Sequence, residues 1–298
     1  MGQRAFDDGL PHRLKPIESD ATVMRIDSHQ HFWRFNPADY GWMKSDWPIR
    51  RDFLPMHLEK ELRARNLDGC VAVQARQSLE ESRWLLELAT GASIIRGVVG
   101  WVDLCSPHLV EELNLFAQRP KFVGVRHVLQ DEPDDQFMLR PDFQHGIAML
   151  RRFGLTYDLL IFSRQLPAAI ALAERFPEQP FVLDHLAKPQ IKDRALSPWR
   201  EQIRHLAKLP NVSCKVSGLV TEADWQSWRA DDFKLYLDVA FEAFGSERLM
   251  FGSDWPVCLL AGSYERVFEL VQAYLARLGT DTAAKFFGGN AAKFYGLV

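Results

Sequence analysis

The sequence predicts one α/β domain, a single (β/α)8 TIM barrel, over residues 24–298. Short apolar runs alternate with longer segments in which apolar residues recur at helical spacing. Eight such pairs occur within about 250 residues, the usual span of this barrel. The first run is not followed by the Gly-x-Gly-x-x-Gly or Walker-type sequence expected of a doubly wound nucleotide-binding sheet.

The predicted strands are the short runs, most of which are apolar at nearly every position. Parallel strands have this composition because helices cover one face of the sheet and the barrel interior covers the other. In chain order, the strands are expected at residues 24–29, 69–75, 94–101, 122–127, 155–161, 180–185, 211–217 and 248–253.

The segments between the strands carry apolar stripes at intervals of three and four residues, which predict amphipathic helices. The clearest stripes predict helices at residues 199–206, 233–244 and 267–278. The last of these has its stripe at Val267, Leu270, Val271, Tyr274, Leu275 and Leu278.

Two segments depart from this alternation. Residues 1–23 contain glycines, prolines and seven charged residues without a periodic apolar pattern, so we expect an N-terminal extension outside the fold. Residues 32–55 follow the first strand and are rich in Phe, Tyr and Trp. We expect this aromatic-rich loop to lie over the mouth of the barrel, where rings can cover the apolar face of a ligand.

Composition restricts the kind of partner. With 47% hydrophobic and 25% charged residues, the chain can build a full core. A net charge of -3 argues against nucleic-acid binding, so a small molecule is the expected substrate. The four cysteines are dispersed, and apolar runs fall short of the roughly 20 residues that a membrane helix needs. We therefore expect a cytoplasmic protein without membrane attachment, and the sequence leaves its oligomeric state open.

Polar residues gather where the predicted strands end. In a TIM barrel these ends surround one mouth, so side chains from five strands are expected to converge there. Because side chains alternate along a strand, residues 27, 29 and 31 should share one face. The polar residues at the strand ends are His29, His31, Arg126, His127, Asp184, His185, Lys215, Ser217, Ser253 and Asp254.

Each of these residues has a functional and a structural interpretation. Asp254 can bind a metal ion or take a proton from water, or it can cap a helix. His185 can be a metal ligand or proton shuttle, or a hydrogen-bonded residue of the core rim. Arg126 and His127 are adjacent, so a regular strand directs one of them into the mouth, and the sequence does not decide which.

Several motifs together resemble the amidohydrolase superfamily, in its branch of single-domain lactone hydrolases and related decarboxylases. The opening and closing motifs particularly resemble sugar-lactone hydrolases such as those that act on L-fuconolactone and L-rhamnonolactone. The motifs are Ile26-Asp27-Ser28-His29-Gln30-His31-Phe32-Trp33, Gly124-Val125-Arg126-His127, Asp184-His185, Gly252-Ser253-Asp254-Trp255-Pro256 and Gly289-Asn290-Ala291-Ala292-Lys293-Phe294-Tyr295.

The resemblance implies one divalent ion, zinc or manganese, bound by His29, His31, Asp254 and His185, with no organic cofactor. A second ion is not expected, because strand five lacks the histidine ligand of many relatives and Arg126 stands where a bridging ligand would be needed. Similarity to lactonases that work without metal leaves open whether the ion is bound or required.

The function that the resemblance implies is hydrolysis of a sugar lactone, L-fuconolactone-like, to the sugar acid. Asp254 is then the base that activates water, and His29 and His31 position the water or the metal. His185 and Arg126 polarise the carbonyl, whereas His127, Trp33 and Trp255 are expected to contact substrate. Two alternatives remain: a metal-assisted decarboxylase of an aromatic or unsaturated acid, and a non-catalytic sugar-binding barrel.

Overall fold

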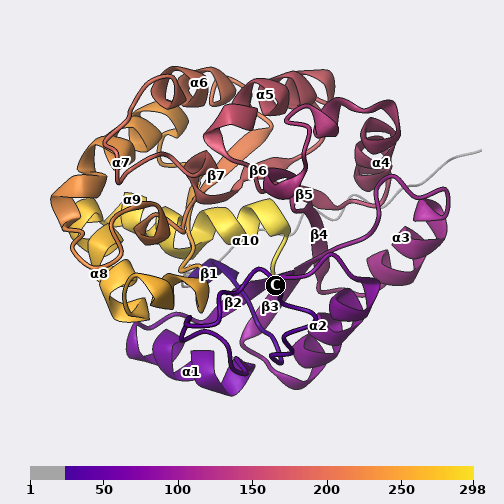
Figure 1. Ribbon diagram of the computed structural model, residues 1–298, viewed down its shortest axis with the longest axis horizontal. Coiled ribbons are helices and arrows are strands. Elements are labelled where there is room, and N and C mark those ends of the chain that lie inside the picture. The colour runs from indigo at the N-terminus through magenta and orange to yellow at the C-terminus, as the bar shows by residue number, and fades with distance from the viewer. Residues whose placement is uncertain (1–23) are drawn as a thin grey trace, which may run out of the picture.

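The computed structural model describes residues 24–298, so the prediction for residues 1–23 lies outside the described residues. Eight parallel strands form one sheet in the order β1 to β8, and helices surround it (Figure 1). A bridge between Gln30 and Trp255 connects the two edges of the sheet. The predicted TIM barrel is therefore confirmed.

Seven of the eight predicted strands contain the observed one and β1 ends one residue beyond its prediction, because runs that are buried on both faces leave little ambiguity. The strands are β1 (Ile26–Gln30), β2 (Gly69–Val73), β3 (Ile95–Gly100), β4 (Phe122–His127), β5 (Thr156–Leu159), β6 (Phe181–Leu183), β7 (Val212–Val216) and β8 (Leu249–Phe251).

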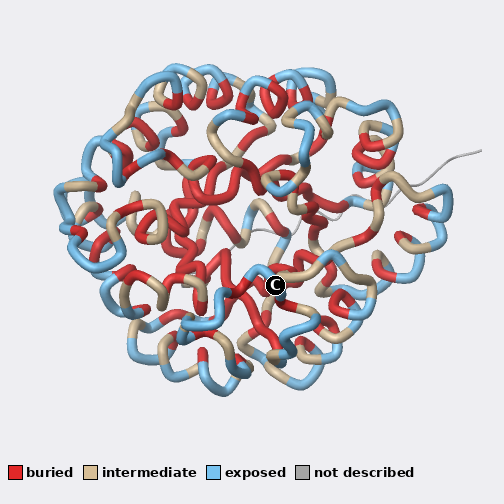
Figure 2. The backbone as a smooth tube through the Cα atoms, viewed as in Figure 1, coloured by how far each residue is buried: buried red, intermediate tan, exposed pale blue. Residues whose placement is uncertain are grey.

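The helices present buried faces to the sheet and exposed faces to solvent (Figure 2). Helix α8 begins three residues before its predicted start, because Ser263 caps it by accepting a hydrogen bond from the Arg266 amide. The helices are α1 (Pro55–Ala64), α2 (Leu79–Gly91), α3 (Leu109–Ala117), α4 (Pro141–Arg152), α5 (Leu166–Arg175), α6 (Trp199–Leu206), α7 (Ala230–Phe244), α8 (Tyr264–Leu275), α9 (Thr280–Ala284) and α10 (Asn290–Tyr295). Within residues 24–298, no helix combines the length and apolarity needed to span a membrane.

Helix α10 covers the end of the barrel at which the strands begin (Figure 1). Tyr295 and Ala291 of this helix pack with Ile26, Val71 and Met250 inside the barrel. The side-chain amide of Asn290, at the start of α10, donates to the carbonyl of Leu249 in β8. One end of the barrel is thus closed, and the opposite end is available for a site.

Strand β1 contains a bulge that changes which side chains face the mouth. Asp27 pairs with Cys70 and Gln30 with Ala72, so β1 holds one residue more than β2 over this span. Asp27 consequently accepts a hydrogen bond from the Tyr264 hydroxyl of α8, at 3.0 Å, on the helix side of the sheet. The prediction that Asp27 shares a face with His29 and His31 is therefore wrong.

Glu81 of α2 connects the loops that follow β1 and β2. It is 3% exposed, and its Oε2 accepts hydrogen bonds from the amides of Ala75 (2.9 Å) and Arg76 (2.7 Å). The hydroxyl of Tyr40 lies 3.4 Å from Oε1. Burial raises the pKa of this carboxyl from 4.5 to about 7.

We predict that Glu81→Gln removes a pH-dependent part of the stability. Because the folded-state pKa of Glu81 is raised, the protonated carboxyl makes its whole contribution to the unfolding free energy below pH 4.5. That contribution is lost as the pH rises through about 7. The difference in unfolding free energy, variant minus wild type, should therefore rise by about 2 kcal/mol as the pH is raised from 5 to 8. Urea unfolding at each pH measures this, and a pH-independent difference would contradict it.

Candidate active site

A cavity of about 640 Å³ opens at the end of the barrel where the strands finish. Its lining includes the predicted residues His31, Arg126, His185 and Asp254. Four tryptophans form a wall in which each ring contacts the next, with centroids about 6 Å apart. They are Trp33, Trp42 and Trp47 from the loop after β1, and Trp225 from the segment after β7.

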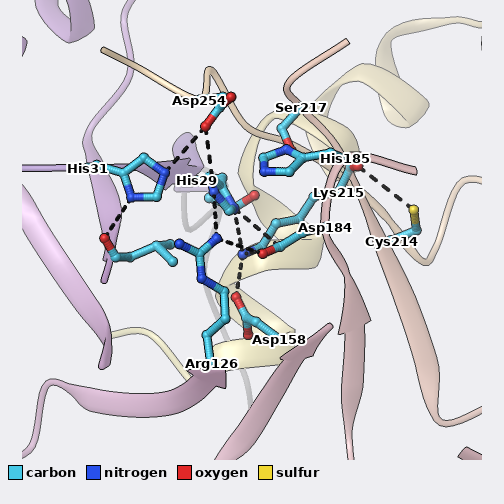
Figure 3. Close-up of polar contacts among 12 residues, drawn as sticks. His29, His31, Arg126, Asp158, Asp184, His185, Cys214, Lys215, Ser217 and Asp254 are labelled. Atoms are coloured by element: carbon cyan, nitrogen blue, oxygen red, sulfur yellow. Dashed lines mark hydrogen bonds and ion pairs between the residues drawn. The ribbon is translucent and has the colours of Figure 1, made fainter. Parts of the chain in front are cut away.

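Three imidazoles and one carboxylate meet at the inner end of this cavity (Figure 3). Asp254 Oδ1 lies 3.3 Å from His31 Nε2 and 3.8 Å from His29 Nε2. The rings of His29 and His185 are 4.5 Å apart, and His185 Nδ1 lies 2.8 Å from the Ser217 hydroxyl. His29 comes from β1, and the other side chains come from the segments that follow β1, β6, β7 and β8, so the barrel brings together four of the predicted site residues.

A left-handed turn directs His185 into the cavity. Strand β6 ends at Leu183, and the φ angles from His185 to Lys188 lie between 50° and 57°. In a turn of about three residues, positions 185 and 188 lie on the same side, and both line the cavity, whereas Leu186 and Ala187 are fully buried. The indole of Trp199 in α6 donates to the Leu186 carbonyl at 2.7 Å.

This backbone conformation is unfavourable for residues other than glycine and costs roughly 1–2 kcal/mol at each position. Asp254 shares it, with φ of 55°. Strain of this kind persists where surrounding contacts fix the backbone, and it concentrates at functional sites. The two strained segments carry His185 and Asp254, which supports a functional role for both.

Behind the imidazoles lies a charge-balanced network of two buried cations and two buried carboxylates (Figure 3). Lys215 Nζ lies 2.5 Å from Asp158 Oδ2 and 3.0 Å from Asp184 Oδ1. Arg126 donates to Asp184 Oδ2 at 3.0 Å. Both nitrogens of His29 face a cation, Nδ1 at 3.1 Å from Lys215 and Nε2 at 3.3 Å from Arg126. The network fixes the position of the His29 ring.

Sequence reasoning did not find this network, although Arg126, Asp184 and Lys215 are among the polar residues that it placed at strand ends. A signal was present, since Asp158 and Lys215 each lie within an apolar, buried strand. A lone charge in such a strand requires a partner, because an unpaired buried charge is too costly. The sequence does not show which strand supplies that partner.

Burial keeps the imidazoles of His29 and His185 neutral near pH 7. It lowers the pKa of His185 to about 4 and takes the pKa of His29 well below 6.5. For Asp254, burial raises the pKa, but the imidazoles of His185 and His31 lower it more, so the carboxyl is ionised. A neutral imidazole can donate or accept a hydrogen bond, and the ionised carboxylate can accept a proton or bind a cation.

Two of the four predicted substrate contacts lie outside the cavity. Arg126 and Trp33 line it, whereas His127 and Trp255 do not. His127 stacks on Phe137 with centroids 5.3 Å apart, because it faces away from the barrel when Arg126 faces in. Trp255 likewise packs against Phe53, with centroids 5.0 Å apart.

A family model described as amidohydrolase matches residues 26–297. The chain belongs to the amidohydrolase family. It is 46% identical to an L-fucono-1,5-lactonase of Burkholderia multivorans, over 92% of this chain and 97% of that protein. An L-fucono-1,5-lactonase of Burkholderia ambifaria is 39% identical, over 92% and 96% of the two chains. A crystal structure of a Burkholderia multivorans amidohydrolase with bound zinc matches with a TM-score of 0.89 and 46% identity, over 92% of this chain and 100% of that one.

The amidohydrolase site has a donor set that fits one divalent ion. His29, His185 and Asp254 each offer one ligand atom, and these atoms lie within 4.8 Å of one another. Three protein ligands with one open position is the usual arrangement of catalytic zinc. Asp184 lies 3.2 Å from His29 Nδ1, where a carboxylate orients a histidine ligand in many metal sites.

His31, the fourth predicted ligand, contacts Asp254 and is not part of that set of three. Its Nδ1 donates to the Val73 carbonyl at 2.8 Å, so in the neutral ring Nε2 directs a lone pair at the Asp254 carboxylate. A cation or a proton between these two acceptors relieves their repulsion. The local chemistry is therefore compatible with a bound cation.

We predict that Gly218→Ala disturbs the site more than its φ angle alone explains. Gly218 has φ of 61°, and an added Cβ would lie 2.5 Å from His185 Nδ1 and 3.2 Å from Asp254 Oδ2. Gly296 has φ of 62° in the left-handed region, with open space around the position of an added Cβ, so Gly296→Ala is the control. Gly296→Ala should cost about 1 kcal/mol of unfolding free energy, and Gly218→Ala about 1–3 kcal/mol more. Equal losses in chemical denaturation would contradict the close packing.

Proposed function

We propose that this amidohydrolase is a lactonase that opens an L-fuconolactone-like sugar lactone to the sugar acid. The observation that carries the proposal is the convergence of His29, His31, His185 and Asp254 at the inner end of a cavity with an aromatic wall. The identity to two L-fucono-1,5-lactonases over nearly the whole chain supports the same reaction and a small-molecule substrate.

Asp254 is proposed as the base toward water. Lactone hydrolysis needs water to lose a proton as it attacks the carbonyl carbon. Asp254 is ionised, lines the cavity and contacts His31, so its carboxylate can accept that proton while the imidazoles hold the water in place. Asp254 is a weak base, but the attacking water becomes strongly acidic as its oxygen bonds to the carbonyl carbon, so the proton then passes readily to the carboxylate.

Arg126 and His185 are proposed to stabilise the oxyanion and the leaving group. Arg126 is held by Asp184 and by Gln74, whose carbonyl and side chain both accept from it, so its positive charge is fixed beside the cavity. His185 accepts a hydrogen bond from Ser217 when its own proton is on Nε2, and it can then donate that proton to the ring oxygen as the carbon–oxygen bond breaks.

When a divalent ion is bound, His29, His185 and Asp254 would hold it, and the ion would lower the pKa of a bound water and polarise the carbonyl. Zinc or manganese suits this mixture of nitrogen and oxygen donors. Arg126 and Lys215 lie next to His29 and repel a cation, so we propose weak binding.

The alternative functions have less support. The decarboxylases that match this fold share 13% or 14% sequence identity with the chain, which speaks for the fold alone. A sugar-binding barrel has no need for the strained backbone that places His185 and Asp254 side by side.

We predict that Asp254→Asn lowers kcat for L-fuconolactone by at least about 100-fold, because the amide keeps the shape of the side chain but cannot accept a proton. The fold should survive, as judged by circular dichroism. Asp224→Asn makes the same chemical change at a half-exposed side chain outside the main cavity lining and should leave kcat unchanged.

Chelation distinguishes the role of the metal from that of the carboxylate. We expect a chelator to lower wild-type kcat less than Asp254→Asn does, with recovery on adding zinc or manganese. Near-normal hydrolysis by folded Asp254→Asn protein would overturn the base assignment, whatever the result with the chelator.

A further inference from the structure

Glu222 and Lys188 are charged side chains of the cavity lining that the proposed mechanism does not use. Glu222 lies in the short turn Val220–Glu222 after β7, and Lys188 is the last residue of the left-handed turn. Within residues 24–298, neither side chain has a hydrogen bond or an ion pair to a protein group. The Lys188 ammonium lies over the Phe162 ring, 5.3 Å from its centroid.

Glu222 is placed to meet a ligand rather than a protein group. It lines both the main cavity and an adjoining polar hollow of about 410 Å³. Burial raises its pKa above 4.5, Lys188 opposes this rise, and Asp254 adds to it, so all three groups act on the same region. A partly buried carboxylate without a partner is costly, which calls for an explanation beyond stability.

The charges of the cavity favour a neutral ligand. Two of the three cations in the lining are already neutralised by carboxylates: Arg76 pairs with Asp39 at 2.9 Å, and Arg126 with Asp184. An anionic ligand would therefore be attracted by one unpaired cation of the lining, Lys188, and repelled by the nearby carboxylate of Glu222. Hydroxyl groups, in contrast, donate strong hydrogen bonds to a carboxylate and accept them from an ammonium.

We propose that Glu222 is a specificity-determining residue, whose carboxylate accepts hydrogen bonds from hydroxyls of the lactone and repels lactones that carry a carboxylate. This inference rests on the proposed lactonase function. Lys188 supports it by donating to a neighbouring hydroxyl. The tryptophan wall, which includes Trp47 and Trp225, covers the apolar face of the ring.

The test is Glu222→Gln, which keeps the size of the side chain and removes its charge, assayed with three lactones. For L-fuconolactone, KM should rise about tenfold and kcat should change less than about threefold, because substrate binding loses one charged hydrogen bond. For δ-valerolactone, which has no hydroxyls, kcat/KM should stay within about twofold. For an aldaric acid monolactone, which carries a carboxylate, kcat/KM should rise severalfold because the repulsion is gone.

Asp224→Asn is the matched control, since Asp224 lies two residues away and lines the adjoining hollow but not the main cavity, in which the lactone is proposed to bind. It should leave all three lactones unaffected. Equal loss of kcat/KM by Glu222→Gln for L-fuconolactone and δ-valerolactone, or an unchanged KM for L-fuconolactone, would overturn the specificity role and leave the lactonase function standing. A wild-type protein inactive on all three lactones would overturn both.

Discussion

The interaction on which the site depends is the buried network of two cations and two carboxylates behind His29. Asp158 of β5, Asp184 after β6, Lys215 of β7 and Arg126 of β4 are each at most 3% exposed. Their mutual contacts replace the water that each charge loses on burial. Four neighbouring strands therefore have to keep a fixed register, and the His29 ring is held between Lys215 and Arg126.

The network also joins the two ends of the barrel. The Tyr295 hydroxyl of α10 donates to Asp158 Oδ2 at 2.8 Å, from the end that this helix covers. On the other side, the strained backbone at His185 and Asp254 places a neutral imidazole beside an ionised carboxylate. Such strain has to be offset elsewhere, and the rigid charged layer and the Trp199 hydrogen bond do so.

Local chemistry explains what the sequence predicts well. Strands buried on both faces and helices with one apolar face have distinct periods, so the barrel and its mouth follow from the sequence. Once the barrel is inferred, His29, His31, His185 and Asp254 fall at strand ends that meet. The proximity of these four residues can therefore be predicted without knowledge of side-chain contacts.

What sequence reasoning misses depends on nonlocal or unusual backbone geometry. The bulge in β1 changes the face of Asp27. Alternation along β4 turns His127 away from the cavity, and Trp255, which follows the left-handed Asp254, packs against Phe53. The positions of Lys188 and Glu222 depend on segments after two different strands. A left-handed turn without glycine has no sequence signature, because the surrounding contacts impose it.

The most direct test of this account is a double-mutant cycle on the free energy of unfolding with Lys215→Met and Asp158→Asn. If the buried charges compensate one another, Lys215→Met alone should cost about 3–5 kcal/mol because it leaves carboxylates unpaired. The double variant should recover at least about 2 kcal/mol relative to the sum of the single losses. A double variant whose loss equals that sum would show that the two charges act independently, and it would contradict the central role of the network.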